Sequence, residues 1–221
     1  SSVIVDDNAL YPINGVGLFG STASDSMVNL MDNLGFYTGC NEYLYKGATP
    51  VTNLLLNVKY LYYHQEDTLN TDFEYVKREG AFNIYKNPAR EMSMGYLMNL
   101  SVEDWDSESA YPFRVQNSLG KQAFGVSELF HNVEIADPAT NGCTASKTND
   151  GEYYFEYKST QADNMVFTIP VTKTIDDLYL FYDGTQVENA QITIDGTNVK
   201  SGDLDGYMLP IGKVSAGSEV K

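Results

Sequence analysis

The stretch LGFYTGCNEYLYKGATPVTNLLLNVKYL, residues 34–61, contains the local signals that shape the first half of the fold. Thr49 followed by Pro50 is typical of a helix start, because threonine caps free amides and proline fits the first turn. A short helix is therefore expected over 51–56. The tyrosine-rich segment 58–63 is expected to be a strand, since aromatic residues favour extended backbone. The stretch predicts helix and strand mixed in one unit.

An amphipathic helix is expected just upstream, in SDSMVNLMDNLG, residues 24–35. Ser24 can cap its start and Gly35 can end it, because these residue types are favoured at the two ends of helices. The apolar residues between them recur at the spacing i, i+3, i+4 and i+7, which predicts one apolar stripe along the helix. They are Met27, Leu30, Met31 and Leu34.

The segment GVGLFG, residues 15–20, has the G-x-G-x-x-G spacing of dinucleotide-binding loops. In such a loop a strand leads into the glycines, and the pyrophosphate meets the first turn of the next helix. Here no strand leads directly into Gly15, and the helix signals begin only at Ser24. We expect a plain loop that binds no dinucleotide.

The rest of the first part mixes both kinds of element. Two strands are expected around Gly80, and further strands over 93–99 and 131–136. A helix is expected after Pro112, ending near Gly125.

Helix signals disappear after the connector DPATNGCTASKTNDG, residues 137–151. Short apolar segments then alternate with turn residues, and Asp195-Gly196 is typical of a hairpin turn. This pattern predicts a β-sandwich, jelly-roll-like in kind, over 146–221. The expected fold class is therefore α+β, with a mixed α/β unit over 1–140 followed by the all-β unit.

The composition excludes some classes of partner. The chain has 30 acidic and 14 basic residues and a net charge of −16. This argues against nucleic acid, and against docking on an anionic lipid surface through a basic patch. No apolar run is long enough to span a membrane, and no signal peptide is visible. Because the chain stops where a new strand begins, a fragment of a longer protein is expected.

Cysteine and histidine are too sparse to define a site. Cys40 and Cys143 are too few for a disulfide framework, and they either pair or remain two separate buried thiols. His64 and His131 lack the spacing of a metal site and are expected at the surface. No metal and no cofactor is therefore predicted.

Carboxylates surround the one tryptophan, Trp105, in the segment SVEDWDSES. Paired carboxylates beside an aromatic ring suit a glycosidase, whereas an acidic loop in an acidic protein is more often solvated. We favour the solvated loop. The carboxylates are those of Glu103, Asp104, Asp106 and Glu108.

Two other segments invite a binding hypothesis. DGTNVKSGDLDG, residues 195–206, resembles a calcium loop in composition but lacks the order of an EF-hand. Aromatic side chains of the second part, with Trp105, are candidates for stacking against sugar rings, although alternate tyrosines can instead face the sandwich core. The candidate carbohydrate contacts are Tyr153, Tyr157, Tyr179, Tyr182 and Trp105.

Several motifs in order along the chain resemble the YfhO family of bacterial multi-pass membrane proteins. They begin with GVGLFGSTASDSMVNLMDNLG and continue through KGATPVTN and NVKYL in the opening stretch. They go on with YKNPAREMSMGYLMN, residues 85–99, and PFRVQNSLGKQAFG, residues 112–125. The last is DGYMLPIGKVSAGSEV, residues 205–220. None of these motifs is a chemical signature, but their order makes the resemblance specific.

The resemblance implies a membrane glycosyltransferase of the GT-C-like kind, which takes sugar from a lipid-linked donor and decorates teichoic acids, lipoteichoic acid among them, outside Gram-positive cells. In that family the catalytic carboxylate lies among membrane helices, so no catalytic residue is carried over to this chain. The chain then resembles a non-catalytic extracytoplasmic domain at the outer face of the cell membrane. Its expected partners are the membrane portion of its own parent chain and a cell-envelope glycopolymer.

Two alternatives from other classes stay open. One is a free-standing carbohydrate-binding or adhesion module. The other is a secreted glycoside hydrolase that uses the carboxylates beside Trp105.

Overall fold

The computed structural model divides the chain into two compact units, which we describe separately. The first comprises residues 1–129 with the short segments 181–183 and 206–210, and the second comprises 130–180, 184–205 and 211–221. The structure describes residues 14–64, 72–89, 97–109, 111–126, 128–133, 143–147, 155–159, 166–182 and 187–221.

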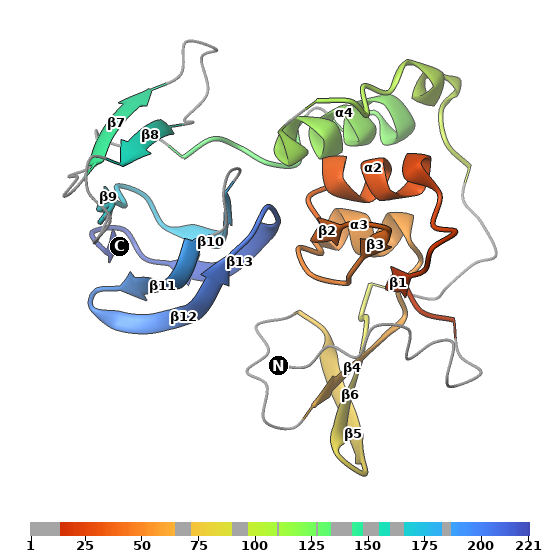
Figure 1. Ribbon diagram of the computed structural model, residues 1–221, viewed down its shortest axis with the longest axis horizontal. Helices are drawn as coiled ribbons and strands as arrows, with labels where there is room; N and C mark the ends of the chain where they lie inside the picture. The colour runs from red at the N-terminus through yellow and green to blue at the C-terminus, as the bar shows by residue number, and fades with distance from the viewer. Residues whose placement is uncertain are drawn as a thin grey trace. The chain divides into compact units, whose positions relative to one another are not determined.

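The first unit combines helices with two small antiparallel sheets (Figure 1). Its helices are α2 (Asp25–Asn33), α3 (Pro50–Leu55), α4 (Pro112–Phe124) and the 3-10 helix η1 (Leu100–Asp104). One sheet has the order β1-β3-β2, from β1 (Leu18–Phe19), β2 (Thr38–Gly39) and β3 (Glu42–Tyr43). The other has the order β4-β6-β5, from β4 (Tyr60–His64), β5 (Glu74–Glu79) and β6 (Phe82–Lys86).

The helix boundaries follow from local chemistry, as the sequence predicts. Thr49 caps α3, since its hydroxyl accepts a hydrogen bond from the Thr52 amide and the Thr52 hydroxyl accepts one from the Thr49 amide. Gly35 follows α2 with φ +88°, and Gly125 follows α4 with φ +71°. These are left-handed conformations that glycine adopts at low cost, so each helix ends there.

The core of the first unit forms where α2 and α4 meet. Met31, Leu34, Phe36 and Val115 make one fully buried apolar cluster. One polar side chain, Gln116, is equally buried. Clusters of this kind supply most of the free energy of folding, because they remove apolar surface from water.

The amide of Gln116 connects the ends of two other helices. Its Nε2 donates to the Leu34 carbonyl at 2.8 Å, and its Oε1 accepts from the Thr49 hydroxyl at 2.6 Å. Nε2 also lies 3.3 Å from the sulfur of Met208. Both polar atoms of the buried amide therefore have partners, which removes the cost of burying them.

A segment from the far end of the sequence completes the first unit. The Met208 amide donates to the Gly35 carbonyl at 2.8 Å. Beside it, the Lys46 ammonium lies 5.1 Å from the ring centre of Tyr37 and 5.5 Å from that of Tyr207. The chain at Gly47 passes close to the Gly35 carbonyl. Only glycine fits there, because a Cβ atom at position 47 would lie 2.0 Å from the Gly35 carbonyl oxygen.

Every described element of the second unit is a strand. One sheet has the order β12-β11-β14-β9, while β10 pairs with β13 and β7 with β8. Asp195 and Gly196 form the β11–β12 turn with φ of 50° and 78°, values suited to a type I′ hairpin turn. The strands that lie wholly or partly in this unit are β7 (Cys143–Lys147), β8 (Phe155–Ser159), β9 (Ile169–Pro170), β10 (Ile175–Phe181), β11 (Val187–Ile194), β12 (Thr197–Leu204), β13 (Met208–Val214) and β14 (Glu219–Val220). The end of β10 at Phe181 and the first three residues of β13 belong to the first unit.

The predicted α+β class is confirmed, with two local corrections. Residues 97–99 and 131–133, the described parts of two predicted strands, have no strand structure. Residues 197–204, in the segment that resembles a calcium loop in composition, form β12, which pairs with β11 beyond the turn. The predicted boundary between 140 and 146 stays a prediction.

Gly47→Ala is expected to lower the free energy of unfolding by about 3 kcal/mol or more, since it adds a left-handed alanine and a backbone clash. Gly80→Ala is the matched control, because Gly80 also has a positive φ but has no atom near its would-be Cβ. Gly80→Ala should lower the free energy of unfolding by about 1 kcal/mol. Urea unfolding of both variants checks this, and equal losses would contradict it.

Candidate functional site

The tryptophan in the acidic segment serves packing. The Trp105 indole donates to the Val115 carbonyl at 2.9 Å, and its ring packs on the apolar cluster of the first unit. The four carboxylates around it all belong to exposed residues. Trp105 thus fixes η1 on α4, and the structure does not bring the carboxylates together in a closed site.

The candidate sugar-binding tyrosines have separate surroundings. The Tyr179 ring is half-buried and meets the Phe130 ring edge-on, with 5.6 Å between centroids. Tyr182 is half-buried and belongs to the first unit, whereas Tyr179 belongs to the second. Tyr153 and the side chain of Tyr157 lie outside the described residues. Sugar contact by this group stays a prediction.

The remaining candidates do not assemble into a chemical centre. Cys40 is an exposed free thiol, so the expectation of a buried or paired thiol is wrong at this position. His64 and His131 are exposed, as expected. Within the described ranges, no group of three His, Cys, Asp or Glu side chains is placed to hold a metal ion.

The glycine-rich segment has a structural place. Leu18 and Phe19, inside GVGLFG, form β1 and pair with Tyr43 and Glu42 of β3. The following helix begins only at Asp25, so the glycines and the helix N-terminus are separated in the chain. That no dinucleotide binds here stays a prediction.

Tyr45 is the described residue with the largest pKa shift. Burial raises the pKa of its phenol well above the ordinary value of 10.0, and the nearby Tyr63 adds to the effect. The phenol donates a hydrogen bond to the Asn53 side-chain oxygen, which acts in the opposite direction. A phenol that stays protonated and bonded at neutral pH is a structural group of the first unit.

Exposed aromatic residues gather on one face of the β4-β6-β5 sheet. The register pairs Tyr62 with Ile84 and His64 with Phe82 across β4 and β6, and Ile84 with Lys77 across β6 and β5. Directly paired residues point to the same side of a sheet. We call this side the tyrosine face, and it surrounds the buried Ile84 with Tyr60, Tyr62, His64, Phe82, Glu74, Glu79, Lys77 and Lys86.

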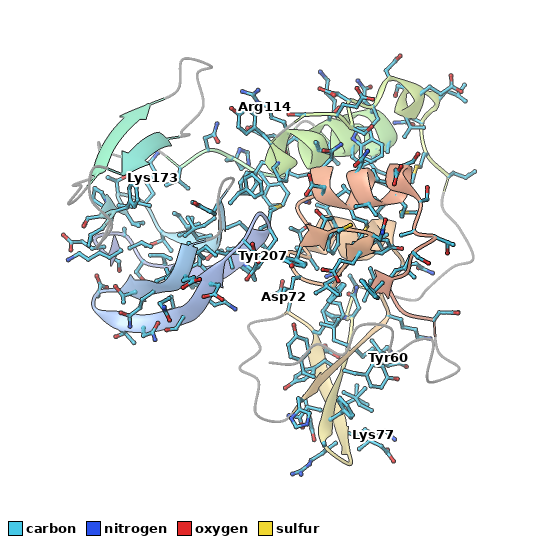
Figure 2. The ribbon with its side chains drawn as sticks, in the orientation of Figure 1. Tyr60, Asp72, Lys77, Arg114, Lys173 and Tyr207 are labelled. Carbon is cyan, nitrogen blue, oxygen red and sulfur yellow. The ribbon has the colours of Figure 1, made fainter. Side chains whose placement is uncertain are left out.

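The tyrosine face leaves its rings open to solvent. The exposed fractions are 40% for Tyr60, 54% for Tyr62 and 40% for Phe82. Figure 2 shows Tyr60 toward the helical end of the sheet and Lys77 near the hairpin end. The two lysines of the face lie beside carboxylates, since Lys77 forms an ion pair with Glu79 and Lys86 pairs in register with Glu74. Exposed amphipathic rings suit contact with a partner rather than acid–base chemistry. Sequence reasoning expected the β4 strand but missed its face, although the alternation in YLYYH was the available signal.

The fold defines a class: an α+β module with aromatic residues both in its core and on its surface. The model of the family described as bacterial membrane protein YfhO matches residues 3–221. The chain therefore belongs to the YfhO family. No curated protein and no solved structure gives a significant match. Among the described residues, no helix has the length and apolar character needed to cross a membrane.

Trp105→Phe should lower the free energy of unfolding by about 1–2 kcal/mol, because it removes the indole hydrogen bond and leaves space beside the cluster. Asp104→Asn, at an exposed position in the same segment, should change the free energy of unfolding by less than about 0.5 kcal/mol. Chemical denaturation measures both. A larger loss for the aspartate variant would show that the acidic segment is structural.

Tyr45 should make stability depend on alkaline pH. Its raised pKa means that the folded chain keeps the phenolic proton above about pH 10, where the unfolded chain releases it. The stabilisation is complete below that pH, and falls by about 1.4 kcal/mol per pH unit above it. Urea unfolding as a function of pH should show a shallower fall for Tyr45→Phe, and identical slopes would refute the assignment.

Proposed function

We propose that this chain is a non-catalytic extracytoplasmic domain of a YfhO-family membrane glycosyltransferase that acts on cell-envelope teichoic acid. The supporting observation is the family match, which covers both units and not one motif alone. The role we assign is scaffolding: the domain holds acceptor or sugar near the membrane portion of its own parent chain.

The described geometry fits a scaffold better than a hydrolase. Transfer of a sugar needs groups positioned around the reacting carbon, with at least one acid in a tuned environment. The candidate acids beside Trp105 are exposed, and the tryptophan itself is engaged with Val115. A lipid-linked donor also has to be met at the bilayer, where the membrane portion of the parent lies.

The purified 221-residue chain, incubated with a polyprenyl-phosphate sugar and teichoic acid, is expected to transfer no sugar above background. In cells, the parent protein without residues 3–221 should reach the membrane and lose transfer, because acceptor positioning is removed. Transfer by the isolated chain that disappears in Asp104→Asn or Asp106→Asn would overturn the proposal. So would full transfer by the shortened parent.

A further inference from the structure

We propose that residues 206–210 are a strap through which the second unit controls the stability of the first. The strap belongs to the first unit, but the chain enters it from the second unit and returns to the second unit at Ile211. The proposal concerns the conformational stability of the chain and does not depend on sugar transfer.

Three consecutive side chains of the strap are buried. The exposed fractions are 6% for Tyr207, 0% for Met208 and 2% for Leu209. A domain is only marginally stable in total, so the removal of three large apolar side chains from water is a substantial part of its stability. The first unit is therefore expected to lose much of its stability when the strap leaves it.

Two glycines allow the backbone of the strap to approach closely. The Met208 amide donates to the Gly35 carbonyl at 2.8 Å. A Cβ atom at position 35 would lie 2.6 Å from the Met208 Cγ atom, and one at Gly47 would lie 3.1 Å from the Met208 nitrogen. The hydrogen bond and the close approach together fix which residue of the strap lies at this point.

Side chains on either side of this bond add specific partners. The sulfur of Met208 lies 3.3 Å from the Nε2 atom of the buried Gln116 amide. The Tyr207 ring meets the Tyr37 ring edge-on, with 6.4 Å between centroids, and its centre lies 5.5 Å from the Lys46 ammonium. These partners belong to α4 and to the connection between α2 and α3, so the strap contacts separate segments of the first unit.

The strap continues directly into a buried strand segment of the second unit. β13 runs from Met208 to Val214, and Pro210 is the one residue between the buried Leu209 and the buried Ile211. Leu209 belongs to the first unit and Ile211 to the second. Because no flexible linker separates these two buried side chains, the state of one end of the strand affects the other.

The length of the intervening chain makes the strap depend on a folded second unit. Most of residues 130–205, which lead to the strap, belong to the second unit. If that unit unfolds, this stretch becomes a long flexible loop, and closing the loop costs conformational entropy in addition to the cost of ordering the strap. Whatever stabilises the folded second unit, a bound ligand included, then stabilises the first unit by linkage.

Trp105 provides a specific probe of the first unit, because it is the single tryptophan of the chain and packs on the apolar cluster there. Ile192 is buried in β11 of the second unit. In urea unfolding of the whole chain, Ile192→Ala should raise the unfolding equilibrium constant read from Trp105 fluorescence by about tenfold or more. Gln191→Ala, at the exposed neighbouring position, is the matched control and should leave the Trp105 transition in place.

A double-mutant comparison tests whether the effect passes through the strap. Met208→Ala weakens the hold of the strap, so in this background Ile192→Ala should shift the Trp105 transition less than in the wild-type chain. Leu61→Ala removes a buried side chain of the first unit in β4, outside the strap, and in that background the shift should remain. Ile192→Val is a milder change that should shift the transition in the same direction by a smaller amount.

Hydrogen exchange of the Met208 amide gives an independent readout. This amide should be protected in the wild-type chain and should exchange about tenfold faster or more in Ile192→Ala, in step with the Trp105 equilibrium constant. Three results would overturn the proposal. They are an unprotected Met208 amide in the wild-type chain, a Trp105 transition that stays in place while circular dichroism shows earlier loss of strands in Ile192→Ala, and equal shifts in the Met208→Ala and Leu61→Ala backgrounds.

Discussion

The buried amide of Gln116 is the constraint on which the first unit depends. It reaches from α4 to the end of α2 through the Leu34 carbonyl, and to the start of α3 through the Thr49 hydroxyl. An amide without water must satisfy both its donor and its acceptor, so the three helix segments can meet in few ways. Within the described residues, no buried side-chain nitrogen or oxygen lacks a partner. The sheet that carries the tyrosine face begins a few residues after α3 in the chain.

A close backbone approach adds a second constraint. Gly35 and Gly47 have no side chains at the point where the Met208 amide bonds to the Gly35 carbonyl. A segment near the end of the sequence, 206–210, thereby becomes part of the first unit. The two units are consequently interleaved along the chain, and an isolated N-terminal piece would lack Met208, which packs beside Gln116.

The aromatic residues of the first unit fall into two groups, those bonded in its interior and those exposed at its surface. Trp105 and Tyr45, which as isolated residues invite chemical hypotheses, are bonded to Val115 and Asn53 inside the first unit. The rings of Tyr60 and Tyr62 are instead exposed to solvent on one side of a sheet.

Sequence alone determined the features that depend on neighbours in the chain. The cap at Thr49, the helix ends at Gly35 and Gly125, and the hairpin at Asp195 all follow from local backbone and hydrogen-bond preferences. The motif order also identified the family, which the match confirms. Tertiary structure alone decided that Gln116 is a core residue, because its partners are far away in sequence. It also decided that Tyr60 and Tyr75 lie on opposite sides of one sheet, since that depends on strand register, including an irregularity in β5, and not on composition.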